Sequence, residues 1–357
     1  MKQLIQPYRD CVITDRCGII ENSHGVHVAI TDSTGRLLYS VGNPSRITLA
    51  RSAAKPAQAL AVLETGAFEQ FGFDDADLAL TCASHSSEEM HISRARQMLR
   101  RGEAKEEHLR CGGHRPLNEE VHRAWIKADY KPTGICNNCS GKHAAMLAGA
   151  RAMGAEFADY HLPEHPMQAK VRQVVEDLCP DSQSVQWAID GCNLPAPAFP
   201  LYYMAQMYAH FAAAADDLDR GGSEVSARTR NSARVFNAMA KRPELVGGTG
   251  RFCTKLMEKY QGQVIGKVGA DACYGVGIRE SEQTRRLGAQ GALGVAVKIE
   301  DGSLEILYAV VMEVLEQLQI GSAAVGSELD AFHHLKLKNT MDVVTGSVSF
   351  AFKVQAG

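Results

Sequence analysis

Strand patterns occur at both ends of this 357-residue chain, and the region between them is mostly helical in pattern. Near the N-terminus, residues 27–32 and 36–41 form a hairpin pattern around a glycine turn. Near the C-terminus, strand patterns occupy residues 263–268, 291–299 and about 346–354. The two sets of strands can share one sheet if the helical region is an insertion between them. The sequence therefore predicts an α/β fold of the α+β type, with an antiparallel sheet made from both chain ends.

This layout also predicts the domain organisation. A chain of this length exceeds what one simple core usually fills, which predicts either one large domain with two lobes or two domains. We expect residues 1–357 to form a single domain with two lobes. Residues 1–85 and 262–357 would form a sheet-containing lobe, and residues 86–261 a mostly helical lobe. The expected helices cover residues 90–101, 118–127, 140–153, 166–178, 201–215, 226–239 and 304–318.

Two short segments are given other structures. The apolar run 78–83 is interpreted as a strand that ends just before Ser84. Residues 185–190 also have a strand-like pattern, and the proline-rich run 194–200 after them is predicted to be a turn.

Charge and hydropathy exclude two classes of partner. The formal net charge of −3 supplies no basic surface for nucleic acid. No stretch approaches the roughly 20 apolar residues that span a bilayer, and the N-terminus lacks the apolar core of a signal peptide. We therefore expect a cytoplasmic protein without a membrane partner, in which the ten cysteines are free thiols or metal ligands rather than disulfides.

The first candidate for chemistry is the run 51–56, Arg-Ser-Ala-Ala-Lys-Pro, which precedes a helical pattern. Ser52 and Lys55 are three residues apart, so on a helix their side chains share one face. A serine in the first helical turn beside an amine can be activated as a nucleophile. The alternative is a helix-start serine with a solvated lysine.

Two further motifs extend this candidate site. Ser84 follows the predicted strand within Cys-Ala-Ser-His-Ser, and Lys267 lies among small residues in a late strand. A helix cap and a plain strand-end turn are the respective alternatives. The order S-x-x-K, serine, K-x-G is the order used by penicillin-binding proteins and class A β-lactamases. Two lysines in one site repel each other, so at least one should be neutral and able to act as a base.

The run 136–143, Cys-Asn-Asn-Cys-Ser-Gly-Lys-His, is a candidate metal corner. Cys139, Lys142 and His143 are three and four residues apart at a predicted helix start, so they can face one point. Cys192 is the nearest further thiol, and Asp190 just before it could hold a lysine or a substrate amine. Buried thiols and a turn aspartate are the alternatives.

Taken together, the five motifs resemble the rhizobial-type (class 3) L-asparaginases over nearly the whole chain. The motifs, in order, are Arg51–Pro56, Ala83–Ser86, Cys136–His143, Asp190–Cys192 and Lys267–Asp271. The resemblance implies hydrolysis of L-asparagine to L-aspartate and ammonia. It also implies a homodimer and a fold like that of the serine β-lactamases and penicillin-binding proteins.

The resemblance further implies roles for individual residues. Two serine–lysine tandems would face each other, Ser52 with Lys55 and Ser84 with Lys267. The resemblance implies that the zinc ligands are Cys139, Lys142 and Cys192. Cys136 is not among them. The predicted substrate-binding residues are Arg51, His143 and Asp190.

We therefore expect Ser52 to attack the side-chain amide of asparagine, with Lys55 as the nearest base; Ser84 is the rival nucleophile. As a zinc ligand, Lys142 would have to lose its proton, and an ion already bound by two thiolates would position substrate rather than act as a strong Lewis acid. The other functions considered are a serine hydrolase of other amides, such as a glutaminase or a β-lactam-recognising enzyme, and a non-catalytic zinc-binding protein.

Overall fold

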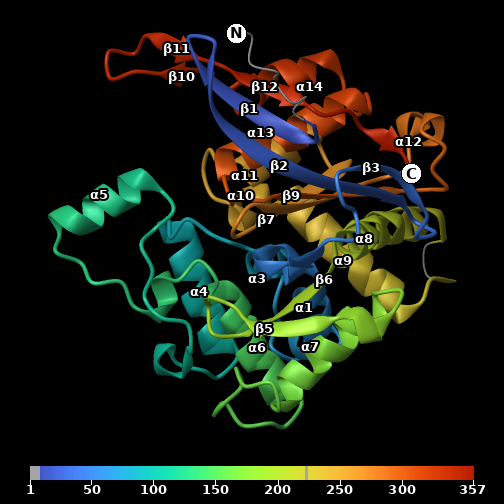
Figure 1. Cartoon of the computed structure of the whole chain (residues 1–357). Coiled ribbons are helices and arrows are strands. Elements are labelled where there is room, and N and C mark those ends of the chain that lie inside the picture. The colour runs from blue at the N-terminus through green and yellow to red at the C-terminus, as the bar shows by residue number, and fades with distance from the viewer. Residues whose placement is uncertain (1–8, 222–223) are drawn as a thin grey trace.

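The computed structural model describes residues 9–221 and 224–357. It combines antiparallel sheets with many helices, which agrees with the predicted α+β class. In Figure 1 the N-terminal strands, in blue, lie beside strands of the C-terminal part, in orange and red, and the green and teal helices of the middle region lie below them. Both ends of the chain therefore contribute to one sheet.

The strands are β1 (Cys11–Arg16), β2 (Ile19–Asp32), β3 (Leu37–Val41), β4 (Ile47–Leu49), β5 (Gln186–Ile189), β6 (Pro195–Pro200), β7 (Val264–Gly269), β8 (Cys273–Ile278), β9 (Leu293–Ile299), β10 (Leu337–Lys338), β11 (Val344–Gly346), β12 (Val348–Ala351) and β13 (Gln355–Ala356). The α-helices are α1 (Lys55–Leu63), α2 (Ala67–Gln70), α3 (Asp75–Thr81), α4 (Glu89–Arg101), α5 (Glu119–Lys127), α6 (Ser140–Ala152), α7 (Pro166–Asp177), α8 (Leu201–Gly221), α9 (Ala227–Lys241), α10 (Pro243–Val246), α11 (Phe252–Lys259), α12 (Glu282–Arg286), α13 (Leu304–Gln317), α14 (Ala323–Glu328) and α15 (Asp330–His333). The 3-10 helices are η1 (Arg51–Ala54), η2 (Glu106–His108), η3 (Gly134–Cys136) and η4 (Ser182–Ser184).

The main sheet has eight strands, and six of them follow the order β12-β1-β2-β9-β8-β7. The long strand β2 connects the two chain ends, because Val28 pairs with Val41 of β3 on one side and with Val297 of β9 on the other. All of these pairings are antiparallel, including that of β1 with β12. The predicted last strand, 346–354, is shorter in the structure, where β12 covers four residues.

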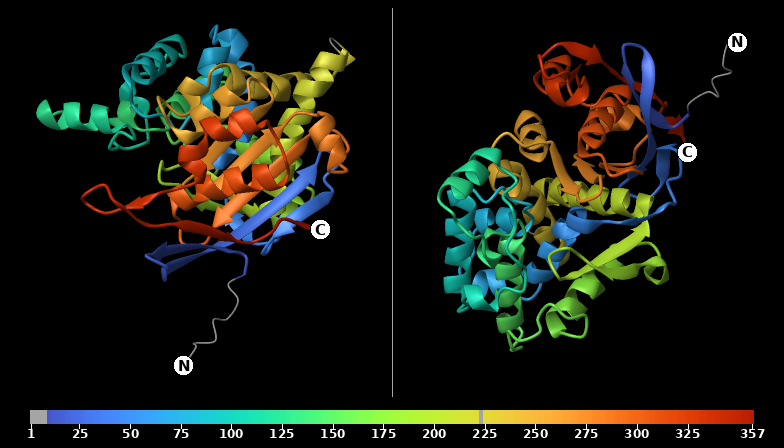
Figure 2. Two further views of the ribbon diagram at one scale, coloured as in Figure 1. Left: turned by 90° about the horizontal axis from the view of Figure 1, so that it is seen from above. Right: turned by 60° about the vertical axis from the view of Figure 1, so that its left-hand side comes forward.

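Helices cover the centre of this sheet on both faces. Figures 1 and 2 place α13 on one side and α8 on the other, and every residue of β7, β8 and β9 is buried. The close approach of α8 requires glycine in the sheet, since a Cβ at Gly294 would lie 1.8 Å from the carbonyl oxygen of Ala205. Strand β7 is an edge strand, which leaves one side of it free to face the helical part.

The predicted helices of the middle region are present as α4 to α9, but the interpretation of residues 78–83 as a strand is wrong. These residues belong largely to helix α3, which packs against α6 and α9. The reason is a capping box in which the Asp74 and Asp77 side chains each accept a hydrogen bond from the other's backbone N–H. Helix α1 also packs on α6, α7 and α9, so much of the segment 55–81 lies with the helices although the sequence placed it in the sheet-containing lobe.

The prediction of a turn at residues 194–200 is also wrong. These residues form β6, the central strand of the three-stranded sheet β4-β6-β5. Proline is tolerated there because β4 pairs only with residues 198–200, so the missing N–H groups of Pro195 and Pro197 lie beyond the end of that partner strand. The Pro197 carbonyl still accepts a hydrogen bond from Ala50 N, at 2.9 Å.

Candidate active site

Two lysine amines converge on the hydroxyl of Ser84. Lys55 is the first residue of α1, Lys267 lies in the edge strand β7, and Ser84 follows α3. Lys55 Nζ lies 3.2 Å and Lys267 Nζ 2.7 Å from Ser84 Oγ. The two lysines are completely buried, and Ser84 is 4% exposed. The three side chains form a continuous chain along which a proton can pass.

The environment of Lys267 favours its neutral form. Burial lowers the pKa of Lys267 to about 7, and the positive charge of Lys55 acts in the same direction. The amine also donates to the Val268 carbonyl oxygen, at 2.7 Å. An amine whose pKa lies near neutrality can both accept and return a proton at physiological pH.

The structure pairs the lysines differently from the predicted tandems. The Ser84–Lys267 hydrogen bond is present, but Lys55 donates to the Ala83 carbonyl and to Ser84. Within the described ranges, no hydrogen bond joins Lys55 to the Ser52 side chain. A buried amine needs hydrogen-bond partners, and the segment after α3 supplies them. The two expected pairs are therefore one Lys55–Ser84–Lys267 chain, with Ser52 outside it.

Ser52 instead lines a small cavity next to this chain. It lies in η1 and is half-buried, whereas Ser84 is almost fully enclosed. The cavity has a volume of about 160 Å³. At roughly 30 Å³ per water molecule this is the space of about five waters, which suits a small molecule and not a polymer. The lining residues are Arg51, Ser52, His114, Asn137, Asn138, Cys139, Asp190, Gly191, Cys192 and Ala270.

Arg51 is held at the cavity by two carboxylates. Its Nε lies 2.6 Å from Asp190 Oδ1, and its Nη1 contacts Asp271 Oδ2. The backbone of Arg51 is in the left-handed region (φ 47°), as is that of Asp271 (φ 55°). Such conformations cost energy in residues other than glycine and cluster at functional sites. Burial opposes ionisation of Asp190, but the charges of Lys142 and Arg51 outweigh it and lower the Asp190 pKa.

Two of the predicted zinc ligands, Cys139 and Cys192, line the cavity, and the third, Lys142, contacts Cys192. Lys142 Nζ is 3.3 Å from Cys192 Sγ, and both side chains are buried. Cys139 precedes α6, and its thiol hydrogen-bonds Cys192, which lowers the Cys192 pKa to about 5, with the charge of Lys142 assisting. The same thiol–thiol hydrogen bond, together with burial, raises the Cys139 pKa to about 12. Burial lowers the pKa of Lys142, but the charges of the two cysteines outweigh it and raise this pKa above its ordinary value. Without metal, the cluster is thus a thiolate, a thiol and an ammonium group.

The donor set fits a zinc ion. A tetrahedral site with ordinary Zn–S and Zn–N bond lengths separates a sulfur and a nitrogen ligand by roughly 3.5 Å, close to the Lys142–Cys192 distance. In the part of the chain that the structure describes, no group of three or more His, Cys, Asp and Glu side chains is arranged to hold a metal. A zinc site here therefore depends on the lysine, and Cys136, which contacts Tyr130 at 3.2 Å, lies outside the set.

His143 differs from the other predicted substrate-binding residues. It is fully buried, its Nδ1 lies 2.5 Å from the hydroxyl of Tyr160, and it is not among the residues that line the cavity. Burial and the charge of Lys142 lower its pKa to about 3, so the ring is neutral. His143 directly follows Lys142 on α6. Its contact with substrate stays a prediction, as do those of Arg51 and Asp190.

Sequence reasoning did not single out several residues of the site. His114 lines the cavity from the loop before α5, and Asp271 holds Arg51 from the turn after β7. Arg251 donates a hydrogen bond to the Ser84 carbonyl oxygen, at 2.7 Å. Glycines precede both His114 and Arg251 and were the available local signal. A Cβ at Gly113 would lie 2.0 Å from the carbonyl oxygen of Pro132, and one at Gly248 would lie 2.3 Å from Ser86 Oγ.

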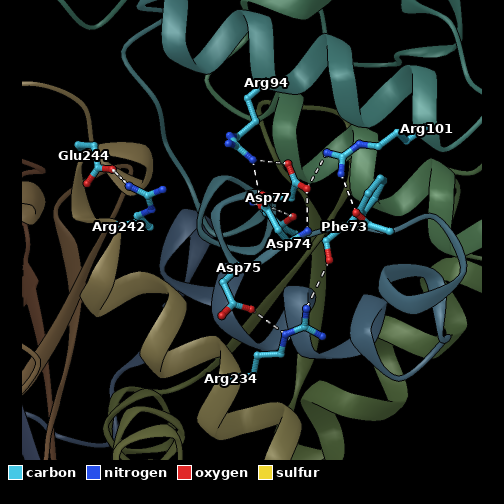
Figure 3. A network of polar contacts seen from close by, with 11 residues as sticks. Phe73, Asp74, Asp75, Asp77, Arg94, Arg101, Arg234, Arg242 and Glu244 are labelled. Carbon is cyan, nitrogen blue, oxygen red and sulfur yellow. Dashed lines mark hydrogen bonds and ion pairs between the residues drawn. The ribbon is translucent and has the colours of Figure 1, made fainter.

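An ion-pair network fixes the helices on either side of Ser84. Asp77 of α3 is fully buried and accepts hydrogen bonds from Arg94 (2.8 Å) and Arg101 (2.6 Å), both on α4. Figure 3 shows this network, with Arg234 of α9 bonded to Asp75 at the start of α3. Helices α3 and α4 flank the segment 82–88, so the network fixes the two ends of the segment that carries Ser84.

The comparison with protein families decides the identity. The family model described as L-asparaginase II matches residues 12–350 of the chain. The chain belongs to this family of L-asparaginases. It is accordingly an enzyme that acts on a small molecule, and the predicted family resemblance is confirmed. No curated protein matched the sequence of this L-asparaginase.

Within residues 9–221 and 224–357 of this L-asparaginase, no helix is long and apolar enough to cross a bilayer.

Proposed function

We propose that the protein hydrolyses L-asparagine to L-aspartate and ammonia through a covalent ester on a serine. The observation that carries the proposal is the buried Lys55–Ser84–Lys267 chain beside a cavity that Ser52 lines. Family membership supports the substrate, and the hydrogen-bonded chain supports the serine–lysine chemistry.

The cavity has complementary charges for a free amino acid. The guanidinium of Arg51 suits the α-carboxylate of asparagine, and the ionised carboxylate of Asp190 suits its α-ammonium group. Held by these two groups, the substrate would present its side-chain amide toward Ser52. Two anchors of opposite charge would select an amino acid over an uncharged amide.

In the proposed reaction, Ser52 Oγ attacks the side-chain amide carbon, and its proton enters the lysine–serine–lysine chain. Lys55 is bonded to Ser84 and is three residues from Ser52 in the sequence, so we take it as the group that receives the Ser52 proton when substrate is bound. The C–N bond breaks as the leaving nitrogen takes this proton back from the chain and departs as ammonia. Water then attacks the ester carbon and gives a proton to neutral Lys267 through Ser84. The chain returns this proton to Ser52 Oγ as the ester C–O bond breaks, so aspartate leaves and both the Ser52 hydroxyl and neutral Lys267 are restored.

Ser84 is the second candidate nucleophile, because both amines contact it directly. Its near-complete burial and absence from the cavity lining favour Ser52 as the group that meets substrate. With Ser52 as the nucleophile, Ser84 carries protons, and its hydroxyl is required for turnover but is not acylated.

Zinc is proposed as the resident metal, with Cys139, Lys142 and Cys192 as its ligands. Zinc bound to two thiolates is a weak Lewis acid and would chiefly supply a fixed positive charge that positions the substrate. Since Lys142 is an ammonium group in the metal-free arrangement, binding zinc must release a proton from it. The release makes the affinity for the metal depend on pH.

We also propose a cytoplasmic homodimer whose single domain has two lobes and resembles the serine β-lactamases and penicillin-binding proteins. The family resemblance supports the dimer. The order S-x-x-K, serine, K-x-G and a helical region inserted between strands of one sheet support the fold relationship.

The test is ammonia release from asparagine, glutamine and a control without amide, beside a β-lactam hydrolysis assay. We expect asparagine to be the preferred substrate. Ser52→Ala and Ser84→Ala should each remove turnover while circular dichroism stays native. Native activity in Ser52→Ala would exclude it as nucleophile. Absence of ammonia release from the zinc-loaded wild type would instead favour a non-catalytic zinc-binding protein.

A further inference from the structure

The segment that carries Ser84 is fastened along its length by the loop between α10 and α11. The Ser84 N–H donates to the Val246 carbonyl (3.0 Å), and the Ser86 hydroxyl donates to the Gly247 carbonyl (3.0 Å). Further along, the Thr249 hydroxyl donates to a carboxylate oxygen of Glu88 (2.6 Å). These hydrogen bonds fix the backbone of the segment that carries the Ser84 side chain.

Arg251 completes this attachment with the one charged group in the loop. Its guanidinium donates to the Ser84 carbonyl oxygen at 2.7 Å and to the Gly247 carbonyl oxygen at 3.3 Å. The Ser84 N–H is therefore bound by Val246 at the end of α10, its carbonyl by Arg251 and its hydroxyl by the two lysines. Arg251 and Lys267 contact the same residue from different sides.

The charge around Lys267 points to a second effect of Arg251. The titratable and charged groups that act on Lys267 or are acted on by it are Lys55, Cys82, Cys139, Arg251, Cys253 and Cys273. The pKa values of Cys82, Cys139 and Cys273 are raised to about 12, in Cys82 and Cys273 by burial and in Cys139 by its thiol partner and burial, so these thiols are neutral. The cations are Lys55 and Arg251, and only the guanidinium cannot lose its proton.

We propose that Arg251 is a positioning residue that fixes Ser84 through its carbonyl and whose permanent charge, together with burial and Lys55, helps to keep the amine of Lys267 unprotonated. The inference rests on the proposed function, in which neutral Lys267 accepts protons through Ser84. Arg251 itself lies outside the residues that line the cavity and acts through these two. The substrate does not need to touch it.

The test compares Arg251→Gln, which removes the charge but keeps a donor, with Arg251→Lys, which keeps the charge but loses the planar fork. Lysine-selective ¹³C and ¹⁵N labelling gives the Lys267 pKa by NMR in folded, zinc-loaded protein, with the signal assigned by its loss in Lys267→Met. Arg16→Gln, an exposed arginine paired with Glu21, is the matched control. The pH profile of kcat is measured for the same proteins.

Arg251→Gln should raise the Lys267 pKa by about half to one unit, because it removes a permanent positive charge that opposes protonation of Lys267. Arg251→Lys and Arg16→Gln should leave it within a few tenths of the wild type. An unchanged pKa in folded Arg251→Gln, or an equal rise in Arg251→Lys, would overturn the inference. If the NMR pKa moves and the kcat profile does not, Arg251 has the inferred effect and the role proposed for Lys267 in turnover fails.

Discussion

The neutral lysine at the centre of the site makes the pH dependence of turnover the sharpest consequence of the structure. Burial and Lys55 lower the pKa of Lys267 from its ordinary 10.5 to about 7. In the proposed mechanism Lys267 acts as a base only when it is deprotonated, so activity should rise as the pH increases through this value. With a pKa of about 7, roughly a tenth of the amines are neutral at pH 6 and roughly nine tenths at pH 8. The structure therefore predicts an increase in kcat of about tenfold between these pH values.

The assay is ammonia release from saturating asparagine by the zinc-loaded enzyme in buffers of constant ionic strength. Lys267→Met keeps a long apolar side chain in the buried position and removes the base. We expect kcat to fall by roughly 10²- to 10⁴-fold, the usual contribution of a positioned general base. The residual activity should lose its rise near pH 7. Native circular dichroism at each pH excludes unfolding as the cause.

Two results would refute this reasoning. A wild-type kcat that does not vary between pH 6 and 8 would mean that Lys267 is not titrating in the rate-limiting step. An unchanged rise near pH 7 in Lys267→Met would assign the titration to another group.

The remaining predictions concern stability, metal and selectivity. Asp77→Ala should lower the free energy of unfolding by about 3 kcal/mol, since it leaves Arg94 and Arg101 of α4 without their buried partner. Glu106→Ala, which removes one member of an exposed ion pair, should lower it by less than about 1 kcal/mol. Urea unfolding measures both changes. Cys192→Ser should abolish stoichiometric zinc uptake, and zinc added to the metal-free wild type should release protons, which a pH indicator detects. Glutamine, longer than asparagine by one methylene, should have a kcat/KM lower by roughly 10- to 200-fold in a cavity of about 160 Å³, and equal values would contradict that binding site.

The sequence predicted the fold where hydrophobic periodicity is long and turns are marked. The hairpin of β2 and β3 and the long helix α13 have such patterns and occur as expected. The errors lie in short apolar runs, where helix and strand patterns coincide. Residues 78–83 became helical because the acidic capping box begins α3 just before them, and residues 194–200 became a strand because partners far along the chain pair with them.

For the site, the sequence identified the reactive residues but not how they are connected. Spacing of three residues suggested that Ser52 would bond Lys55, but the lysine is buried and bonds the segment after α3. That bond depends on the packing of α1 against α3, which local spacing does not encode. Arg251 was missed for the same reason, because it reaches Ser84 across 167 residues of chain.

The central claim is that Ser52 is acylated while Ser84 conducts protons, and the position of a covalent adduct tests it most directly. Enzyme mixed with excess asparagine is quenched in acid during the first turnovers, digested, and analysed by mass spectrometry, with Ser52→Ala and Ser84→Ala treated in parallel. The account predicts an aspartyl group on the peptide that contains Ser52, and none in Ser52→Ala. An aspartyl group on Ser84 would contradict it.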